Sequence, residues 1–217
     1  MFVGREPRFY ASVHYNGRPV LSAITVDDRN YFSSDKNKDG FGRAEYYYSG
    51  SSGAGTQMTD FTGYNVAKKV STSSSIRNDQ AVYRPYIHIR YAEILLTYAE
   101  AKNEVSGPDQ SIYDAINAVR RRAGQPEISG LGQEDMRKQI RNERRVELAF
   151  ENKRYFDIMR WKIGDKSLTG PFYKMEITYQ EPPEKVPTSV STPLYNPRAI
   201  YFERIFDTQK NYLLPIP

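Results

Sequence analysis

Apolar residues recur at helical spacing in the middle of this chain, and this pattern constrains its fold more than any other feature. After Pro85 they recur every three or four positions, which predicts an amphipathic helix that Gly107-Pro108 ends. A second stripe ends at Gly124 and Pro126 and predicts an antiparallel partner helix. The stripes are Ile87, Tyr91, Ile94, Leu95, Tyr98 and Ala101 in the first helix, and Ile112, Ala115, Ile116, Val119 and Ala123 in the second.

A third helix is predicted from Glu134 to Trp161, with Gly164 as its C′ stop. Its apolar set is too wide for one stripe, so we expect a bend near Glu151-Asn152 or burial on more than one side. The preceding helical hairpin resembles one tetratricopeptide-type unit, which needs further helices to bury its faces. We therefore predict a mostly α fold: a portion of a tetratricopeptide-like α-α superhelix with irregular loops and short β-hairpins.

Three regions of the chain differ in composition and in predicted secondary structure. Residues 1–80 are rich in loop and strand signals, 81–163 are helical, and 164–217 form a Pro-rich extended tail. Alternation of apolar and polar residues from Arg8 to Tyr15, followed by Asn16-Gly17, predicts a strand and a tight hairpin turn. Pro19 would restrict the return strand to a sheet edge. Residues 27–63 form a long Gly-containing segment, which is typical of a functional or disordered loop.

The composition excludes several kinds of chemistry. The chain has no Cys and two His, so it offers no disulfide, thiolate site or three-histidine metal site. Its net charge of +5 invites a nucleic-acid interpretation, but basic and acidic residues alternate between Glu134 and Arg160, which is typical of an ion-paired helix. No apolar stretch is long enough to span a bilayer, and the amino terminus has no apolar signal region. We expect either a cytoplasmic protein or one whose targeting segment lies outside the chain.

Four segments in order carry a family likeness. They are Arg5-Glu6-Pro7-Arg8-Phe9-Tyr10; Ile89-Arg90-Tyr91-Ala92-Glu93-Ile94-Leu95-Leu96 with Tyr98-Ala99-Glu100-Ala101; Glu143-Arg144-Arg145-Val146-Glu147-Leu148-Ala149-Phe150-Glu151 through Arg154-Tyr155-Phe156-Asp157 to Arg160-Trp161; and Tyr212-Leu213-Leu214-Pro215-Ile216-Pro217. Together they resemble the C-terminal half of the SusD/RagB family, the surface glycan-binding lipoproteins of Bacteroidetes.

The resemblance implies a function without catalysis. It implies non-enzymatic binding of an oligosaccharide or polysaccharide at the outer membrane, and delivery of that ligand to a SusC-like TonB-dependent transporter. Family members are typically more than twice this length, so the resemblance also implies a lipid anchor outside this chain. A peptide-binding RagB-like member and a helical scaffold that mainly docks onto the transporter stay open as alternatives. No nucleic-acid partner is expected.

The candidate ligand site lies in the long loop. Tyr46, Tyr47 and Tyr48 follow Phe41 and Arg43 and precede a Ser- and Gly-rich stretch. Loop aromatics offer flat apolar faces to sugar rings, and a neighbouring Arg donates hydrogen bonds to hydroxyls. In a strand, alternation would instead turn one face of the tyrosine run inward as packing.

The same loop holds a candidate calcium motif. Asp35, Asn37 and Asp39 place oxygen ligands at alternate positions before Gly40, as in the first half of a calcium loop. The twelfth position is Tyr46, where a bidentate Glu belongs, and no flanking helical pattern is present. A polar surface turn explains the segment equally simply, and no other cofactor is expected.

Glu143, Glu147 and Glu151 share one face of the third predicted helix. Two such carboxylates can in principle hold a metal or divide acid and base roles. Arg144 and Arg154 each lie three residues from one of these glutamates, and no His accompanies them, so we favour a structural ladder of ion pairs.

The helical aromatic residues have two interpretations. Trp161 is the only tryptophan, and indole is a good stacking surface for sugars, but its place at a helix end favours a position in the core. Tyr91, Tyr98, Phe150 and Phe156 lie at helical spacing, and we expect them in the core and not on a ligand platform.

Overall fold

The computed structural model describes residues 4–15, 18, 64–70, 82–83, 85–179 and 193–213, with the backbone alone at 174–179 and 193–201. The chain divides into two compact units. The helical unit contains Met1–Ser12 and Pro85–Trp161, and the strand unit contains Val13–Arg84 and Lys162–Pro217. Each unit is described by itself below.

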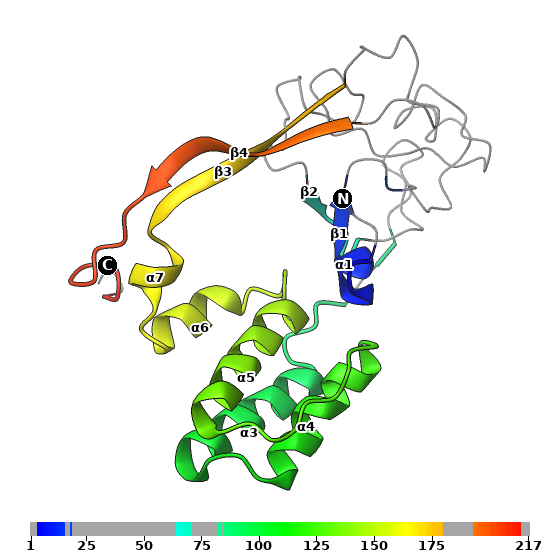
Figure 1. Cartoon of the computed structure of the whole chain (residues 1–217), viewed down its shortest axis with the longest axis vertical. Coiled ribbons are helices and arrows are strands. Elements are labelled where there is room, and N and C mark those ends of the chain that lie inside the picture. Colours follow the sequence, from blue (N-terminus) through cyan, green and yellow to red (C-terminus); the bar gives the residue numbers. More distant parts are fainter. Residues whose placement is uncertain are drawn as a thin grey trace. The chain divides into compact units, whose positions relative to one another are not determined.

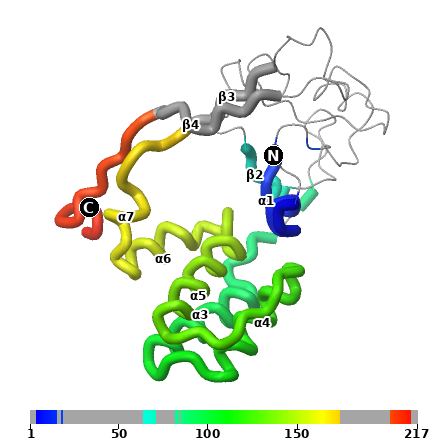
Figure 2. The backbone as a smooth tube through the Cα atoms, viewed as in Figure 1, coloured from blue at the N-terminus to red at the C-terminus, as the bar shows by residue number. Residues whose placement is uncertain are grey.

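Five helices make up the described part of the helical unit (Figure 1). α3 packs against both α4 and α5, and the three lie side by side in Figure 2. Their contact buries an aliphatic core, which confirms the predicted mostly helical class. The helices are α1 (Pro7–Ser12), α3 (Tyr91–Ser106), α4 (Gln110–Arg122), α5 (Gln133–Glu147) and α6 (Arg154–Arg160). The core comprises Leu96, Ala99, Ile112, Ala115, Ile116, Val119, Met136 and Ile140.

Local signals place the ends of α3 and α4. Gly107 and Gly124 have φ values of 75° and 68°, which glycine adopts at low cost, and both predicted helix ends are confirmed. The Asp109 side chain caps α4 by accepting a hydrogen bond from the Ile112 amide at 3.2 Å. α3 begins at Tyr91, so Ile87, which the predicted stripe included, lies before the helix.

The single bent helix predicted from Glu134 to Trp161 is wrong, because the chain breaks fully after Glu147 and resumes as α6 at Arg154. Phe150 and Asn152 both adopt positive φ values, of 62° and 60°, which the helical backbone cannot accommodate. Gly164 begins α7 (Gly164–Ser167) in the strand unit and does not act as a C′ stop.

The predicted strand from Arg8 to Tyr15 is correct only in its last third. Residues Pro7–Ser12 form α1, with Pro7 at the first helical position, where its fixed φ suits a helix. β1 (Val13–Tyr15) then pairs antiparallel with the distant β2 (Tyr64–Val66), with Val13 opposite Val66. The expected Asn16-Gly17 turn and Pro19 lie outside the described residues.

Much of the segment expected to be an extended tail is a two-stranded antiparallel ladder. β3 (Gly170–Tyr179) pairs with β4 (Pro193–Arg204), from Gly170 opposite Arg204 to Tyr179 opposite Pro193. The register shifts between Lys174 and Glu176, opposite Pro197, which has no amide hydrogen to donate to a ladder. The closing residues 214–217 lie outside the described part. No helix among the described residues is long and apolar enough to cross a membrane.

Candidate functional site

Glu143, Glu147 and Glu151 are all buried and ion-paired. Arg8 of α1 donates to Glu143 at 2.6 Å and to Glu147 at 3.0 Å. Arg90, just before α3, donates to Glu147 at 2.6 Å and to both carboxylate oxygens of Glu151, at 2.8 and 2.9 Å. Arg120 and Arg122 of α4 complete the network on Glu143 and Glu147 at 2.8 and 2.6 Å. The carboxylates therefore join four segments of the helical unit.

These contacts correct the predicted ladder along one helix. Arg144 does not pair with Glu147 but holds the buried Asp157 through two hydrogen bonds, at 3.0 and 3.1 Å. Arg154 does not pair with Glu151. Arginines from other segments occupy the three glutamates, which leaves none of the three placed as a free acid or base. Among the described residues, no group of three His, Cys, Asp or Glu is placed to hold a metal ion.

The network also fixes the charge state of Glu147. Burial by itself raises the pKa of this carboxyl, because a charge is costly away from water. Hydrogen bonds from Arg90 and Arg8, with the nearby charge of Arg122, outweigh burial and leave the pKa of Glu147 below its ordinary value. Glu147 is therefore an ionised structural partner at neutral pH.

Trp161 lies half-buried among charged side chains and outside the apolar core. Its indole nitrogen donates a hydrogen bond to Glu100 at 2.6 Å. The guanidinium groups of Arg141 and Arg160 lie 4.8 and 4.9 Å from the ring centroid, at cation–π distance. Protein groups engage the ring, but it lies outside the apolar core, so the expected core position of Trp161 is wrong.

The expectation that four aromatic residues of this unit are buried is wrong. Tyr91 and Tyr98 are 75% and 44% exposed, because α3 turns the neighbouring stripe of Leu96, Ala99 and Asn103 to the core. Phe150 and Phe156 are 47% and 66% exposed, because the break between α5 and α6 carries them out of a continuous helix.

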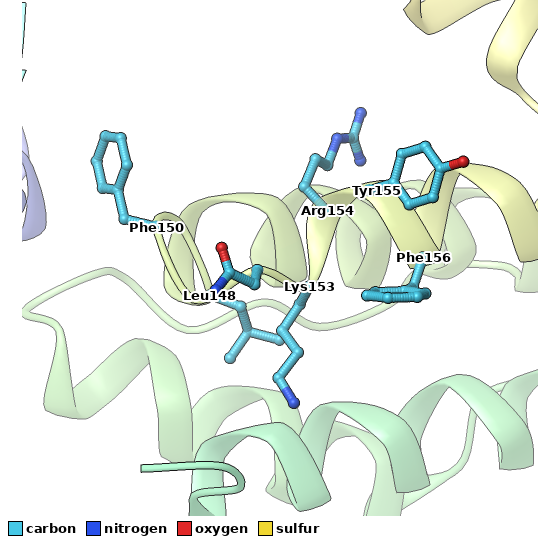
Figure 3. A pocket seen from close by; sticks show the side chains of 7 residues that line it. Leu148, Phe150, Lys153, Arg154, Tyr155 and Phe156 are labelled. Carbon is cyan, nitrogen blue, oxygen red and sulfur yellow. The ribbon is translucent and has the colours of Figure 1, made fainter. Parts of the chain in front are cut away.

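An open hollow of about 410 Å³ has formed at this break (Figure 3). Phe150 lies at one end, and the Tyr155 and Phe156 rings lie together at the other, with centroids 5.7 Å apart. Lys153 and Arg154 extend in different directions from the same turn. The lining residues are Leu148, Phe150, Asn152, Lys153, Arg154, Tyr155 and Phe156.

This hollow was not predicted from the sequence. Its one local signal is Asn152, because asparagine tolerates a left-handed backbone and often ends helices. Nothing local marks Phe150, whose positive φ is rare for a bulky residue.

The predicted ligand and calcium residues lie outside the described part of the chain. These are Tyr46, Tyr47, Tyr48, Phe41 and Arg43 for the ligand, and Asp35, Asn37 and Asp39 for calcium. Their roles remain predictions.

The antiparallel α3–α4 hairpin packed with α5 defines a mostly helical, tetratricopeptide-like protein. Comparison with known protein families matches the SusD family over residues 1–217, so the chain belongs to the SusD family.

Individual relatives agree with this membership. The chain is 33% identical over 140 residues to SusD-like protein P2 of Formosa agariphila, which covers 61% of this chain and 22% of the relative. It is 41% identical over 81 residues to SusD-like protein P25 of the same organism, covering 36% and 15% of the two chains. A crystal structure of a SusD-like protein from Bacteroides fragilis superimposes with a TM-score of 0.65 at 28% identity, over 100% of this chain and 36% of that one. The chain thus spans about a fifth of P2 and a third of the crystallised protein.

Proposed function

We propose that this chain serves non-enzymatic glycan capture at the bacterial cell surface. The observation that carries the proposal is the SusD-family match over all 217 residues. In the full protein, a lipid anchor outside this chain holds the molecule on the outer membrane. The captured oligosaccharide or polysaccharide passes to a SusC-like TonB-dependent transporter.

The chemistry of the helical unit supports binding without reaction. Acid–base catalysis needs a carboxyl group free to exchange a proton with the ligand. Glu143 and Glu147 are 1% and 2% exposed, and arginines hold both of them. The exposed side chains near them include Arg145 and Phe150, which suit recognition of polar groups and sugar faces.

The hollow between α5 and α6 is the described surface that best fits a sugar. Phe156 presents most of its ring to solvent at one end of the hollow, beside the half-exposed Tyr155. An aromatic face stacks on the axial C–H groups of a pyranose, and the gain is lost when the ring is removed.

Phe156→Ala is expected to weaken binding of the tightest ligand on a glycan array about tenfold, which corresponds to about 1.4 kcal/mol. Titration calorimetry on the native chain and on the variant measures the change in affinity. Tyr91→Ala removes an equally exposed ring from α3 and is expected to leave affinity unchanged. Equal loss in the two variants, or none in Phe156→Ala, contradicts a contact in the hollow. An array on which peptides bind and glycans do not favours the RagB-like alternative.

A second candidate function is docking to a protein helix, and one observation favours it. Exposed apolar residues follow α3 and the segment before it at spacings of four, three, four and seven, the pattern of a helix–helix seam. If the chain is mainly a docking scaffold, this seam is the surface that binds the transporter. Tyr91→Ser with Ile94→Ser then abolishes transporter co-purification and leaves glycan affinity intact, whereas unchanged co-purification eliminates this candidate. The seam residues are Ile87, Tyr91, Ile94, Tyr98 and Val105.

The loop residues are tested separately. Triple alanine replacement of Tyr46, Tyr47 and Tyr48 is expected to lower glycan affinity at least tenfold, since each replacement would remove a stacking contact. Calorimetry with and without added calcium also tests Asp35, Asn37 and Asp39, because a calcium-ordered loop would bind glycan more tightly with the ion present. Unchanged affinity in the triple variant removes the tyrosines from the site.

A further inference from the structure

The helical unit pairs most of its arginines with carboxylates, but three arginines of α5 and α6 are exceptions. Arg8, Arg90, Arg120 and Arg122 all bind the buried glutamates. Arg141, Arg145 and Arg154 make no ion pair with any carboxylate in the described part of the chain.

Two of these three arginines lie against one aromatic ring, and the third lies nearby on α5. The guanidinium groups of Arg141 and Arg154 lie 4.8 and 5.9 Å from the Trp161 centroid. Arg145 is one turn beyond Arg141 on α5, and its charge acts directly on Arg154. We call Arg141, Arg145, Arg154 and Trp161 the basic cluster.

The carboxylates beside the basic cluster are already occupied. Asp157 binds both Arg144 and Arg160, and Glu100 binds Arg160 and the indole of Trp161. Arg144 and Arg160 therefore occupy both of these carboxylates, and Glu104, which feels the charge of Arg141, is paired with Arg137. None of the three carboxylates forms an ion pair with an arginine of the basic cluster. One aromatic ring offsets only a small part of such a charge.

Two atomic details show that this excess charge is costly. The Nε atom of Arg141 is buried and has no hydrogen-bond partner. Burial and the charge of Arg145 lower the pKa of Arg154, and Asp157 offsets only part of that shift. The cluster therefore holds one donor, the Nε of Arg141, that has been desolvated but not satisfied.

We propose that the basic cluster is a binding site for an acidic saccharide, through a carboxylate or sulfate group on the sugar. Guanidinium groups present paired donors that match the geometry of both anions. This assignment rests on the proposed function and names its substrate class.

The adjacent hollow favours an acidic sugar over an acidic protein segment. Arg154 belongs to both features, since it approaches Trp161 and also lines the hollow with Tyr155 and Phe156 (Figure 3). In a sugar acid, the anionic group is joined to the sugar ring at a fixed distance. The sugar ring could therefore stack on the aromatic side chains while its anionic group binds the guanidinium groups. A peptide carboxylate requires only the cations.

The test compares polygalacturonate with its fully methyl-esterified form, which keeps the backbone and removes the charge. The 217-residue chain is expected to bind the acidic form at least tenfold more tightly at low salt. Arg145→Gln and Arg154→Gln are each expected to remove most of that preference. Arg121→Gln is the matched control, because it changes the net charge equally at an exposed pair on α4 and is expected to keep the preference. Circular dichroism checks that each variant is folded.

The results separate this inference from the proposed function. Equal affinity for the two forms, or equal loss in Arg121→Gln, overturns the basic cluster as a specific site. Polyglutamate that binds as tightly with the same dependence on Arg145 and Arg154 overturns the saccharide in favour of an acidic protein partner. Neutral glycans on the array decide the proposed function independently, since their binding does not need the cluster.

Discussion

Glu147→Gln is expected to lower the free energy of unfolding by about 3–5 kcal/mol, because it removes a buried charge that three arginines share. Glu147 is 2% exposed and receives hydrogen bonds from Arg8, Arg90 and Arg122. The amide keeps the shape of the side chain but supplies no charge and turns a donor toward the guanidinium groups. Urea unfolding followed by circular dichroism measures the loss.

Glu134→Gln is the matched control on the same helix. Its side chain is 74% exposed and pairs with Arg137, so the expected change is below about 1 kcal/mol. A comparable loss in both variants, or a loss below about 1 kcal/mol in Glu147→Gln, contradicts the structural role of the network.

The lowered pKa of Glu147 predicts that the folded chain loses stability in acid. Because the folded pKa of Glu147 lies below its unfolded value, the ionised pair contributes its full stability above the unfolded pKa. That contribution declines as pH falls below the unfolded value and is lost once pH passes the folded one. Stability of the native chain should therefore fall in this acidic range, and the slope should be shallower in Glu147→Gln. Identical slopes of stability against pH in the native chain and in Glu147→Gln would show that Glu147 does not contribute to acid unfolding.

Leu96→Ala is expected to cost about 2–5 kcal/mol, since it opens a cavity where α3 meets α4 and α5. Leu96 is fully buried in the core cluster, and Ile112, Ile116 and Ile140 there are fully buried too. Such a core is close-packed, so its neighbours relax only partly into the space. Thermal and urea unfolding report the change.

Val105→Ala removes apolar atoms from the same helix at a position that is 86% exposed, and stability should change by less than about 0.5 kcal/mol. If the two variants lose similar stability, α3 does not bury the face that contains Leu96.

Elements defined by neighbouring residues could be predicted from the sequence. Gly107 and Asp109 lie next to the helix ends that they specify, through a positive φ and a side-chain cap, so the α3–α4 hairpin was predictable. The β3–β4 ladder was not predictable, because each strand is stabilised by pairing with a strand far away in the sequence. Its first pair, Gly170 and Arg204, shows this separation.

The candidate sites show the same division. The acidic face of α5 was visible in the spacing of Glu143 and Glu147, but their partners were not, since Arg8 lies 135 residues from Glu143. The hollow beside Phe156 depends on a break that only Asn152 marks.

The helical class of the central region, the ends of its first hairpin and the likeness to the SusD family follow from sequence, because each rests on residues adjacent or regularly spaced along the chain. The three-dimensional packing sets which stripe of α3 faces inward, which arginines pair with each glutamate, and which arginines pair with none. Those choices depend on charge and packing between segments far apart in sequence, and no local pattern encodes them.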